Sequence, residues 1–428
     1  QLVLADSPVF TLYLPLIFHD YALVIPPVGV QMYGDVSAGN GLTRVVESHT
    51  TWVRVPIAWS ALELANTTPD QYAWDVIDAS LQNLRDHNIQ AMITIGDNPQ
   101  WASRYAQGPV TNTADLLEFV GALVARYPHV YYWEFYNEPD NAKFFGLNGA
   151  GYAAMLTAVY PVVKAANPAA NVVLGGLALD RFIDQGGIFD RDFLRDVLLN
   201  CTQPCFDVAN FHYYPYFRSN WEPYGRDLLG KANYVSQTLA AYGYPRPLMM
   251  SETGWPSFAS WGSPELQASY VPKAYVRAYA APLLAAVWYA LGDADSGNPG
   301  LIDRSLYPRA AYTALLTLNT VLTDARLVRI IPSGEIGFPN VEGYQFTVPG
   351  GSVRKRVDVY WYDCPSLYQP GVPVDCDGVA PLYLTATRVA KIDKLGNRQI
   401  VEDEDDGYRD GRVTLGVLSS PIFIDYAP

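Results

Sequence analysis

The sequence predicts an α/β protein, a (β/α)8 TIM barrel followed by a C-terminal antiparallel β-sandwich domain. Two observations lead to this fold class. Short β-branched and aromatic runs alternate eight times with longer helix-like stretches, and successive runs begin 24 to 41 residues apart. That spacing accommodates a strand, a loop and a crossover helix. After about residue 324, short alternating runs separated by Gly, Pro and Asp replace this pattern, which is typical of a β domain.

The predicted strands of the barrel begin at Val28, Trp52, Gln90, Tyr131, Asn171, Asp207, Pro247 and Ala285. Helices are predicted at Trp74–His87, Thr113–Tyr127, Gly151–Ala166, Asp190–Asn200, Arg226–Ala241, Pro264–Ala281 and Ser305–Leu322. Strands joined by crossover helices pair in parallel, so we expect them to close into a barrel. An open doubly wound sheet is the alternative, although the turn from Gly34 to Gly39 lacks the Gly-x-Gly-x-x-Gly pattern that such sheets usually carry.

The predicted organisation has three segments. Residues 1–27 form an N-terminal extended segment, whose run Val9–Leu16 could add a strand to the β domain. The barrel covers residues 28–323 and the C-terminal β-sandwich covers 324–428. The acidic run from Glu402 to Gly407 lacks the ligand spacing of an EF-hand, and we interpret it as a solvated turn.

Composition excludes several functions. The chain has 428 residues, of which 29 are Lys or Arg and 43 are Asp or Glu; the net charge of −14 repels nucleic acid and anionic lipid. No apolar run is long enough for a transmembrane helix. The 10 Trp, 31 Tyr and 16 Phe offer flat faces that suit sugar rings. The five scattered His residues argue against a His-rich metal site, and we expect no metal or organic cofactor.

The four cysteines form two local pairs, Cys201 with Cys205 and Cys364 with Cys376, and neither pair has the spacing of a zinc or redox site. Two short disulfides are expected, with buried free thiols as the alternative. Acidity and cysteine pairing are typical of exported proteins. We therefore expect an extracellular protein, a monomer, whose signal peptide was removed before Gln1.

Two glutamates at strand ends are the candidate catalytic residues. In a parallel barrel the active site lies where the strands end. The fourth strand ends in the run from Trp133 to Asp140 and contains Glu138, whereas the seventh is followed by Glu252, 114 residues later. Hydrolysis of a glycosidic bond needs one protonated and one ionised carboxyl group. Two glutamates on strands from opposite sides of the barrel mouth meet that need.

This arrangement resembles the clan A glycoside hydrolases, with Asn137-Glu138-Pro139 on the fourth strand and Glu252 on the seventh. The resemblance spans about residues 28–322 and implies a retaining β-glycosidase. It also implies that substrate is bound by further matching residues, namely Arg54, Asn137, His212, Tyr214 and Trp288. The run from Trp133 to Asp140 is similar to family 39 enzymes, whereas the run from Ser251 to Ser257 is similar to family 17 enzymes. Pro139 speaks against family 17, and the sequence leaves the family open.

The expected roles agree with elementary chemistry. Glu138 would hold a proton because apolar neighbours and the like charge of Glu252 raise its pKa. Glu252 would stay ionised beside Arg54 and the Tyr214 hydroxyl, and would act as the nucleophile. Asn137 would donate to a sugar 2-hydroxyl. Glu134 lies deeper in the barrel, so we interpret it as a buried partner of Arg54 or His212.

Aromatic and histidine residues at other strand ends complete the candidate site. Trp101 follows the third strand and Trp288 lies on the eighth, where their rings could stack on sugars. His212 could orient a carboxylate or bind a hydroxyl group. Two other functions stay open: a carbohydrate-binding or adhesion protein that keeps the barrel without hydrolysing, and a metal-dependent hydrolase, for which His212 is the one candidate histidine ligand at a strand end.

Overall fold

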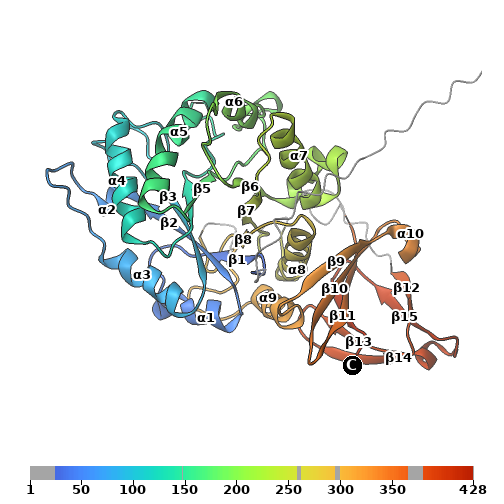
Figure 1. The fold of residues 1–428 in the computed structure, drawn as a ribbon. Helices are drawn as coiled ribbons and strands as arrows, with labels where there is room; N and C mark the ends of the chain where they lie inside the picture. Colours follow the sequence, from blue (N-terminus) through green and yellow to red (C-terminus); the bar gives the residue numbers. More distant parts are fainter. Residues whose placement is uncertain (1–24, 147, 258–261, 295–298, 365–378, 428) are drawn as a thin grey trace, which may run out of the picture.

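The computed structural model describes residues 25–146, 148–257, 262–294, 299–364 and 379–427. It contains a barrel and a β domain side by side (Figure 1). The predicted extra strand at Val9–Leu16 lies outside the described residues. Within them, no helix is both long and apolar enough to cross a membrane.

All eight predicted barrel strands are present and parallel. They are β1 (Val28–Gln31), β2 (Trp52–Ala58), β3 (Gln90–Gly96), β4 (Tyr132–Phe135), β5 (Asn171–Leu174), β6 (Ala209–Tyr213), β7 (Leu248–Thr253) and β8 (Ala286–Trp288). The hydrogen-bonded order is β5-β4-β3-β2-β1-β8-β7-β6. The bridge between Val173 and Val208 joins β5 to β6 and closes the ring, so the open sheet is excluded.

Helices surround the strands in the predicted order. They are α1 (Leu42–Glu47), α2 (Trp59–Leu62), α3 (Asp75–Asp86), α4 (Thr113–Arg126), α5 (Gly149–Ala166), α6 (Phe193–Asn200), α7 (Asp227–Ala241), α8 (Pro264–Ala280) and α9 (Ala310–Val321). Side-chain caps set three of the starts, since Asn112 accepts from the amide of Ala114, Asn148 from that of Gly151 and Ser263 from that of Leu266. The short α1 and α2 were not predicted, because four to six residues show no helical period.

Inside the barrel an apolar layer supports a polar layer. Trp52, Met92, Val173, Val208, Met249, Ala285 and Val287 form a buried cluster. Side chains two residues apart on a strand share a face. Two residues after Trp52, Met92 and Met249 come Arg54, Thr94 and Ser251, which are buried polar residues. The apolar layer therefore closes the barrel floor and leaves the polar layer beneath the mouth.

The β domain consists of two antiparallel sheets. The strands are β9 (Arg326–Ile331), β10 (Val341–Gly350), β11 (Val353–Tyr362), β12 (Ala380–Thr385), β13 (Arg388–Asp393), β14 (Arg398–Glu402), β15 (Arg412–Val417) and β16 (Ile422–Asp425), with a short helix α10 (Ser333–Ile336). Six form the sheet β14-β13-β16-β11-β10-β9, and β12 pairs with β15. The alternating run at residues 381–390 predicts a single strand, but the structure divides it between β12 and β13. No strand was predicted at β14. The acidic run after β14 is a short 3-10 turn at Asp403–Asp406.

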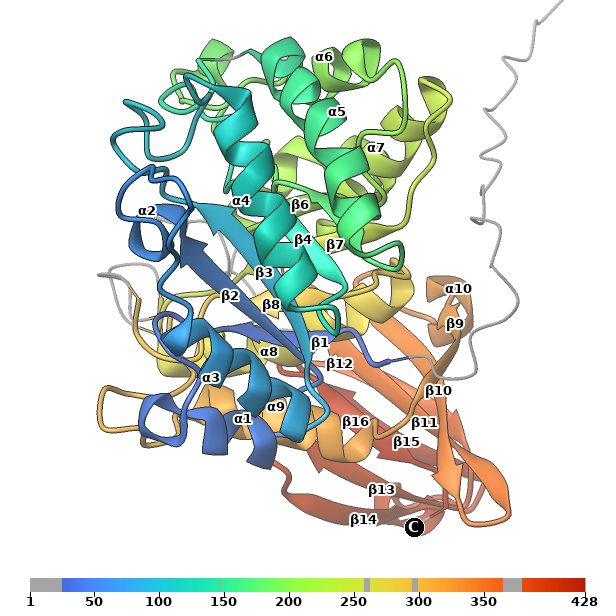
Figure 2. The same ribbon diagram turned by 60° about the vertical axis from the view of Figure 1, so that its left-hand side comes forward.

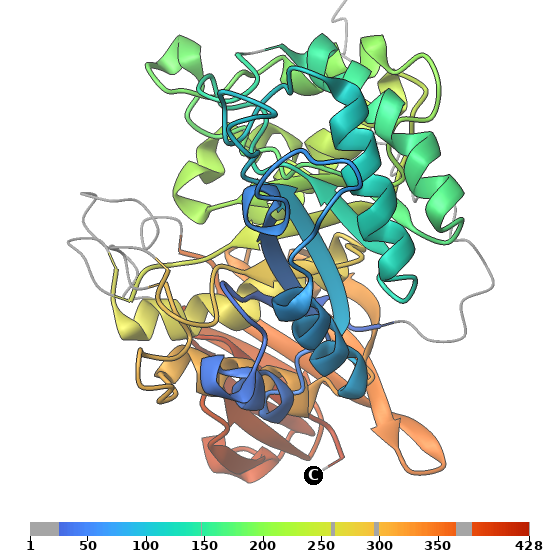
Figure 3. The same cartoon turned by 90° about the vertical axis from the view of Figure 1, so that its left-hand side faces the viewer.

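Buried ion pairs fasten the β domain to the barrel. Arg277 of α8 contacts Glu342 of β10 at 2.6 Å, and Arg218 contacts Asp363 at 3.0 Å. Figures 2 and 3 show the orange and red strands of this domain against the yellow and orange helices α8 and α9. Cys201 and Cys205 form a disulfide, as predicted. Cys364 is also disulfide-bonded, and Cys376 lies outside the described residues.

Candidate active site

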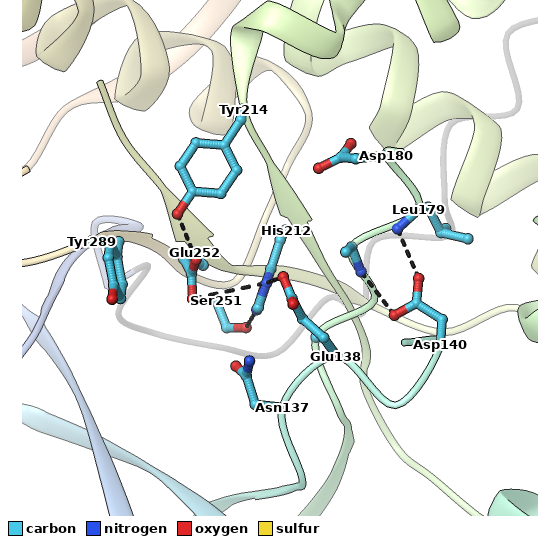
Figure 4. A network of polar contacts seen from close by, with 12 residues as sticks. Asn137, Glu138, Asp140, Leu179, Asp180, His212, Tyr214, Ser251, Glu252 and Tyr289 are labelled. Carbon is cyan, nitrogen blue, oxygen red and sulfur yellow. Dashed lines mark hydrogen bonds and ion pairs between the residues drawn. The ribbon is translucent and has the colours of Figure 1, made fainter. Parts of the chain in front are cut away.

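Glu138 lies in the tight turn that follows β4. Its backbone adopts a left-handed conformation, with φ of 46°, which is uncommon for a residue other than glycine. Two anchors hold the turn: the amide of Glu138 donates to Gly176 O at 3.1 Å, and Asp140 accepts from the amides of Ala178 and Leu179 at 3.1 and 2.8 Å. This backbone directs the Glu138 side chain over the barrel mouth (Figure 4).

Glu252 lies near the end of β7 and faces the same space. Glu252 pairs in register with His212 of the neighbouring strand β6. Tyr214 donates a hydrogen bond to Glu252 Oε1, and Arg54 NH1 lies 3.4 Å from Oε2. Both predicted partners of this carboxylate are therefore in place.

The two glutamates and His212 converge. One carboxylate oxygen of Glu138, one of Glu252 and a ring nitrogen of His212 all lie within 4.8 Å of one another. His212 Nδ1 is 3.0 Å from Glu138 Oε1 and 3.8 Å from Glu252 Oε2. The Glu138 and Glu252 side chains keep 21% and 12% of their surface exposed, whereas His212 keeps none. Solvent or substrate can therefore reach both carboxyl groups.

Arg54 organises the polar layer beneath the carboxyl groups. It binds Glu134 through Nε and NH2 at 2.8 and 3.1 Å, and its NH1 donates to Gln31 Oε1 at 2.6 Å. Its NH2 also donates to Asn137 Oδ1 at 2.7 Å. Because the oxygen of the Asn137 amide faces Arg54, the donor end of that amide points away from it. Glu134 is thus the buried partner of Arg54.

Burial gives the two glutamates different proton affinities. It raises the pKa of Glu138 to about 7, against the opposing charges of Arg54 and Lys231. Burial also raises the pKa of Glu252, but His212, Arg54 and the Tyr214 hydroxyl oppose that rise. Burial lowers the pKa of His212 to about 4, so its imidazole is neutral at pH 7. The raised pKa favours a protonated Glu138 near neutral pH, whereas His212, Arg54 and Tyr214 favour the charged form of Glu252 against burial and the charge of Glu138.

Two tyrosines that sequence analysis missed border the site. Tyr33 follows β1 and Tyr289 follows β8; the Tyr33 hydroxyl donates to that of Tyr289 at 3.3 Å. Burial raises the pKa of Tyr33, and the charge of Glu252 adds to the rise, so the two groups are close. Both positions end a strand, and the same rule that identified Glu138 could have found them.

Two predicted substrate-binding tryptophans pack against protein. Trp288 is fully buried, its Nε1 donates to Pro299 O at 3.0 Å, and its ring lies 6.1 Å from that of Tyr270. Trp101 packs edge-on against Trp59 at 5.5 Å. Their stacking on sugars stays a prediction. Arg54, Asn137, Glu138, His212, Tyr214 and Glu252, in contrast, come together at the mouth.

Buried residues behind the site were also missed. Lys231 of α7 donates to Asp180 Oδ1 at 2.8 Å, and Asn210 and Ser251 contact Glu134. Asn210 lies two residues before His212, which gives a sequence signal because alternate residues of a strand enter the barrel. Ser251 immediately precedes Glu252, where alternation gives no such signal, and the pairing register of β7 shifts between Met250 and Thr253. Nothing in the sequence pointed to Lys231, which reaches the site from a helix.

The converging trio is the one group of three or more His, Cys, Asp or Glu side chains close enough to hold a metal among the described residues. Arg54 lies 3.4 Å from Glu252 in the same place. A guanidinium at that distance repels a cation. The residues present therefore suit acid and base chemistry better than metal binding.

Known folds and families match this chain. The model of the family described as Cellulase (glycosyl hydrolase family 5) matches residues 24–294, more than half of the chain. No curated protein sequence matches it. Among solved structures, a family 39 glycoside hydrolase from Bacteroides cellulosilyticus WH2 is 16% identical with a TM-score of 0.67, covering 94% of this chain and 80% of that one.

Two further structures share the fold. A glucosidase from Croceicoccus marinus is 15% identical with a TM-score of 0.63, covering 95% of this chain and 97% of that one. A family 39 β-xylosidase from Caulobacter crescentus is 14% identical with a TM-score of 0.63, covering 94% and 96%. The family model confirms the clan A resemblance, and the family 39 structures share the fold of this chain. The chain belongs to the cellulase family, glycosyl hydrolase family 5, and is a glycoside hydrolase on a TIM barrel.

Proposed function

We propose that the protein is a retaining β-glycosidase that works by double displacement, with Glu138 as acid/base and Glu252 as nucleophile. The observation that carries this proposal is the approach of the two carboxyl groups, with oxygens within 4.8 Å. Retaining enzymes hold these groups about 5–5.5 Å apart, whereas inverting enzymes leave about 6.5–9.5 Å for a water molecule. The short separation supports direct attack by a carboxylate.

In the first step, Glu252 attacks the anomeric carbon while Glu138 gives its proton to the leaving oxygen. The raised pKa of Glu138 keeps that proton available near neutral pH. In the second step, the ionised Glu138 takes a proton from water, which attacks the glycosyl intermediate. Asn137, whose oxygen is held by Arg54, has its donor end available for a sugar 2-hydroxyl.

Proton NMR of the first-formed sugar tests retention. Aryl β-xylosides and β-glucosides are the substrates to begin with, because two structural neighbours are named a β-xylosidase and a glucosidase. We expect the β-anomer first, with slow mutarotation afterwards. An α-anomer as first product would overturn the nucleophilic role of Glu252.

A wider panel separates hydrolysis from the other functions. It includes β-galactosides, β-mannosides and β-1,3-glucans, with product lengths recorded. Binding without turnover at every pH would favour a carbohydrate-binding protein. Activity that is lost in chelator would favour a metal-dependent hydrolase.

We also propose that the protein is extracellular and monomeric. The disulfide Cys201–Cys205 supports export, because disulfides persist in oxidising compartments. Cell fractionation tests the location and sedimentation analysis tests the mass. Recovery in the cytosol, or a mass of twice 47.3 kDa, would contradict these proposals.

A further inference from the structure

A closed set of hydrogen bonds links the acid/base to the floor of the site. His212 Nδ1 lies 3.0 Å from Glu138 Oε1, and its Nε2 lies 3.1 Å from Ser251 Oγ. Ser251 Oγ is in turn 2.9 Å from Asn210 Nδ2 and 3.0 Å from Glu134 Oε1. His212, Ser251, Asn210 and Glu134 are all buried, so these groups must satisfy one another.

The orientation of Asn210 is fixed by the backbone. Its Oδ1 is 3.0 Å from the amide of Ser251, which can only donate, so the Asn210 oxygen is the acceptor. The Nδ2 group therefore donates its two hydrogens, one to Ser251 Oγ and one to Glu134 Oε1 at 2.8 Å. Ser251 Oγ therefore accepts one hydrogen bond from Asn210. Its single hydroxyl hydrogen has two potential acceptors, His212 Nε2 and Glu134 Oε1.

Glu134 is the acceptor of the Ser251 hydroxyl hydrogen bond. Burial alone would raise the pKa of Glu134, but the two-pronged contact with Arg54 and the Thr94 hydroxyl outweigh it and lower the pKa, so the carboxylate is ionised. A charged oxygen is a stronger acceptor than a neutral imidazole nitrogen at nearly the same distance. If Ser251 donated to His212 instead, a lone pair of its oxygen would face the charged Glu134 Oε1 and be repelled by it. The remaining lone pair of Ser251 therefore accepts from His212.

We propose that Ser251 is a positioning residue: it holds the His212 proton on Nε2, so that the Nδ1 lone pair faces Glu138 and accepts a hydrogen bond from its protonated carboxyl group. A hydrogen bond to the neutral form of an acid disfavours its ionisation. Ser251 thus helps to keep Glu138 protonated until the leaving oxygen arrives. This inference rests on the proposed role of Glu138 as the acid/base.

The backbone of Gly176 packs closely against the His212 ring. A Cβ atom on Gly176 would lie 2.2 Å from His212 Nε2 and 2.6 Å from Ser251 Oγ, and no real Cβ comes that close. The glycine backbone therefore lies directly against the ring and the hydroxyl group. In Figure 4, His212 lies between Glu138 on one side and Ser251 and Glu252 on the other.

Other titratable groups also reach Glu138 and His212. They are Glu252 from β7, Arg54 from β2, Glu134 from β4, Lys231 from α7, Asp140 from the turn after β4, Asp180 from the loop after β5 and Tyr214 after β6. Of these groups, Glu134 also accepts a hydrogen bond from Ser251, so the tautomer of His212 is best measured directly in the wild-type protein.

The direct test is a ¹⁵N NMR spectrum of the full chain labelled at its histidines, of which there are five. Comparison with His212→Gln identifies the His212 signals. We expect Nε2 protonated and Nδ1 unprotonated from pH 5 to 6, where Glu138, with its pKa of about 7, carries its proton. A proton on Nδ1, or a charged imidazolium in that range, would overturn the proposal. This readout does not depend on activity, so it is separable from failure of the proposed glycosidase function.

The kinetic test uses Ser251→Ala. Without the acceptor for Nε2–H, His212 can place its proton on Nδ1 and stabilise the ionised form of Glu138. The alkaline limb of the kcat/KM profile should then move to lower pH by about one pH unit, which corresponds to a tenfold change in the ionisation equilibrium of Glu138. Ser251→Thr, which keeps the hydroxyl group, should have its alkaline limb at the wild-type pH.

Ser80→Ala is the matched control, because the Ser80 hydroxyl of α3 is also buried and accepts a hydrogen bond, from the amide of Val36 at 2.9 Å, which involves none of the residues of the hydrogen-bonded set around His212. This variant should lower stability without moving the limb. An unmoved limb in Ser251→Ala, or an equal shift in Ser80→Ala, would contradict the positioning role. If Ser251→Ala does not fold, the wild-type spectrum still decides.

Discussion

Arg54 and Glu134 form a buried two-pronged ion pair inside the barrel, with Nε–Oε2 at 2.8 Å and NH2–Oε1 at 3.1 Å. The Arg54 and Glu134 side chains expose only 2% and 0% of their surface. A buried pair repays its lost hydration only through good geometry and further hydrogen bonds. Here the same arginine also contacts Gln31, Asn137 and Glu252.

Removing Arg54 should therefore lower the stability of the barrel. Arg54→Ala leaves Glu134 charged and unpaired, and we expect the free energy of unfolding to fall by about 3–5 kcal/mol. Urea unfolding followed by tryptophan fluorescence measures this loss. Arg195→Ala is the control, because Arg195 is an exposed arginine beside Asp192 and Asp196, and exposed pairs contribute about 0–1 kcal/mol. Equal losses in both variants would contradict the central role of Arg54.

Activity should follow a bell-shaped curve against pH. Glu138 must carry a proton, so activity should fall as pH rises through its pKa of about 7. Glu252 must be ionised, and because its pKa is raised the acidic limb should lie above the ordinary range of glutamate. Glu138→Gln has no proton to lose and should show no alkaline fall on an activated aryl glycoside. An unchanged bell in that variant would reject the assignment.

The nucleophile can be replaced by a small anion. Glu252→Gly should be inactive alone, while Glu138 can still protonate the leaving oxygen. Azide should restore turnover and give a glycosyl azide of inverted configuration, because one displacement replaces two. For Glu138→Ala, azide should instead give a product of unchanged configuration. Product NMR distinguishes the two outcomes, and their reversal would exchange the two roles.

Gly176 should tolerate no side chain. A methyl group there meets His212 Nε2 at 2.2 Å, so Gly176→Ala should displace the ring, lower kcat and cost about 1–3 kcal/mol of stability. Gly334→Ala is a suitable control, because nothing lies within 4 Å of its added Cβ. Steady-state kinetics and thermal unfolding check both variants. Full activity in Gly176→Ala would show that the ring position does not matter for turnover.

The unreduced protein should have no reactive thiol. Cys201 and Cys205 are bridged and Cys364 is bonded, so a thiol reagent should titrate none of the four cysteines in denaturant. Reduction should then expose four. Four thiols before reduction would contradict the disulfides and weaken the case for export.

The sequence determined the barrel because its evidence is local. Each of the eight strands is a short apolar run that can be read without knowing its neighbours, and all were found within two residues of their predicted starts. Glu138 and Glu252 could be predicted as partners because strand ends in a parallel barrel meet at one mouth. β14 was missed because its run, Arg398–Glu402, is mostly polar and partly exposed, and pairing with β13 is what makes it a strand.

Only the tertiary structure decided how the polar residues join. Gln31, Glu134, Asn210 and Ser251 come from four different strands, and no local pattern says which side chains meet inside the barrel. Burial of Trp288 and the proton affinities of the two glutamates likewise depend on everything packed around them. Hydration and charge act through space rather than along the chain. The sequence could therefore identify Glu138 and Glu252 as candidates, whereas their proton affinities depend on the fold.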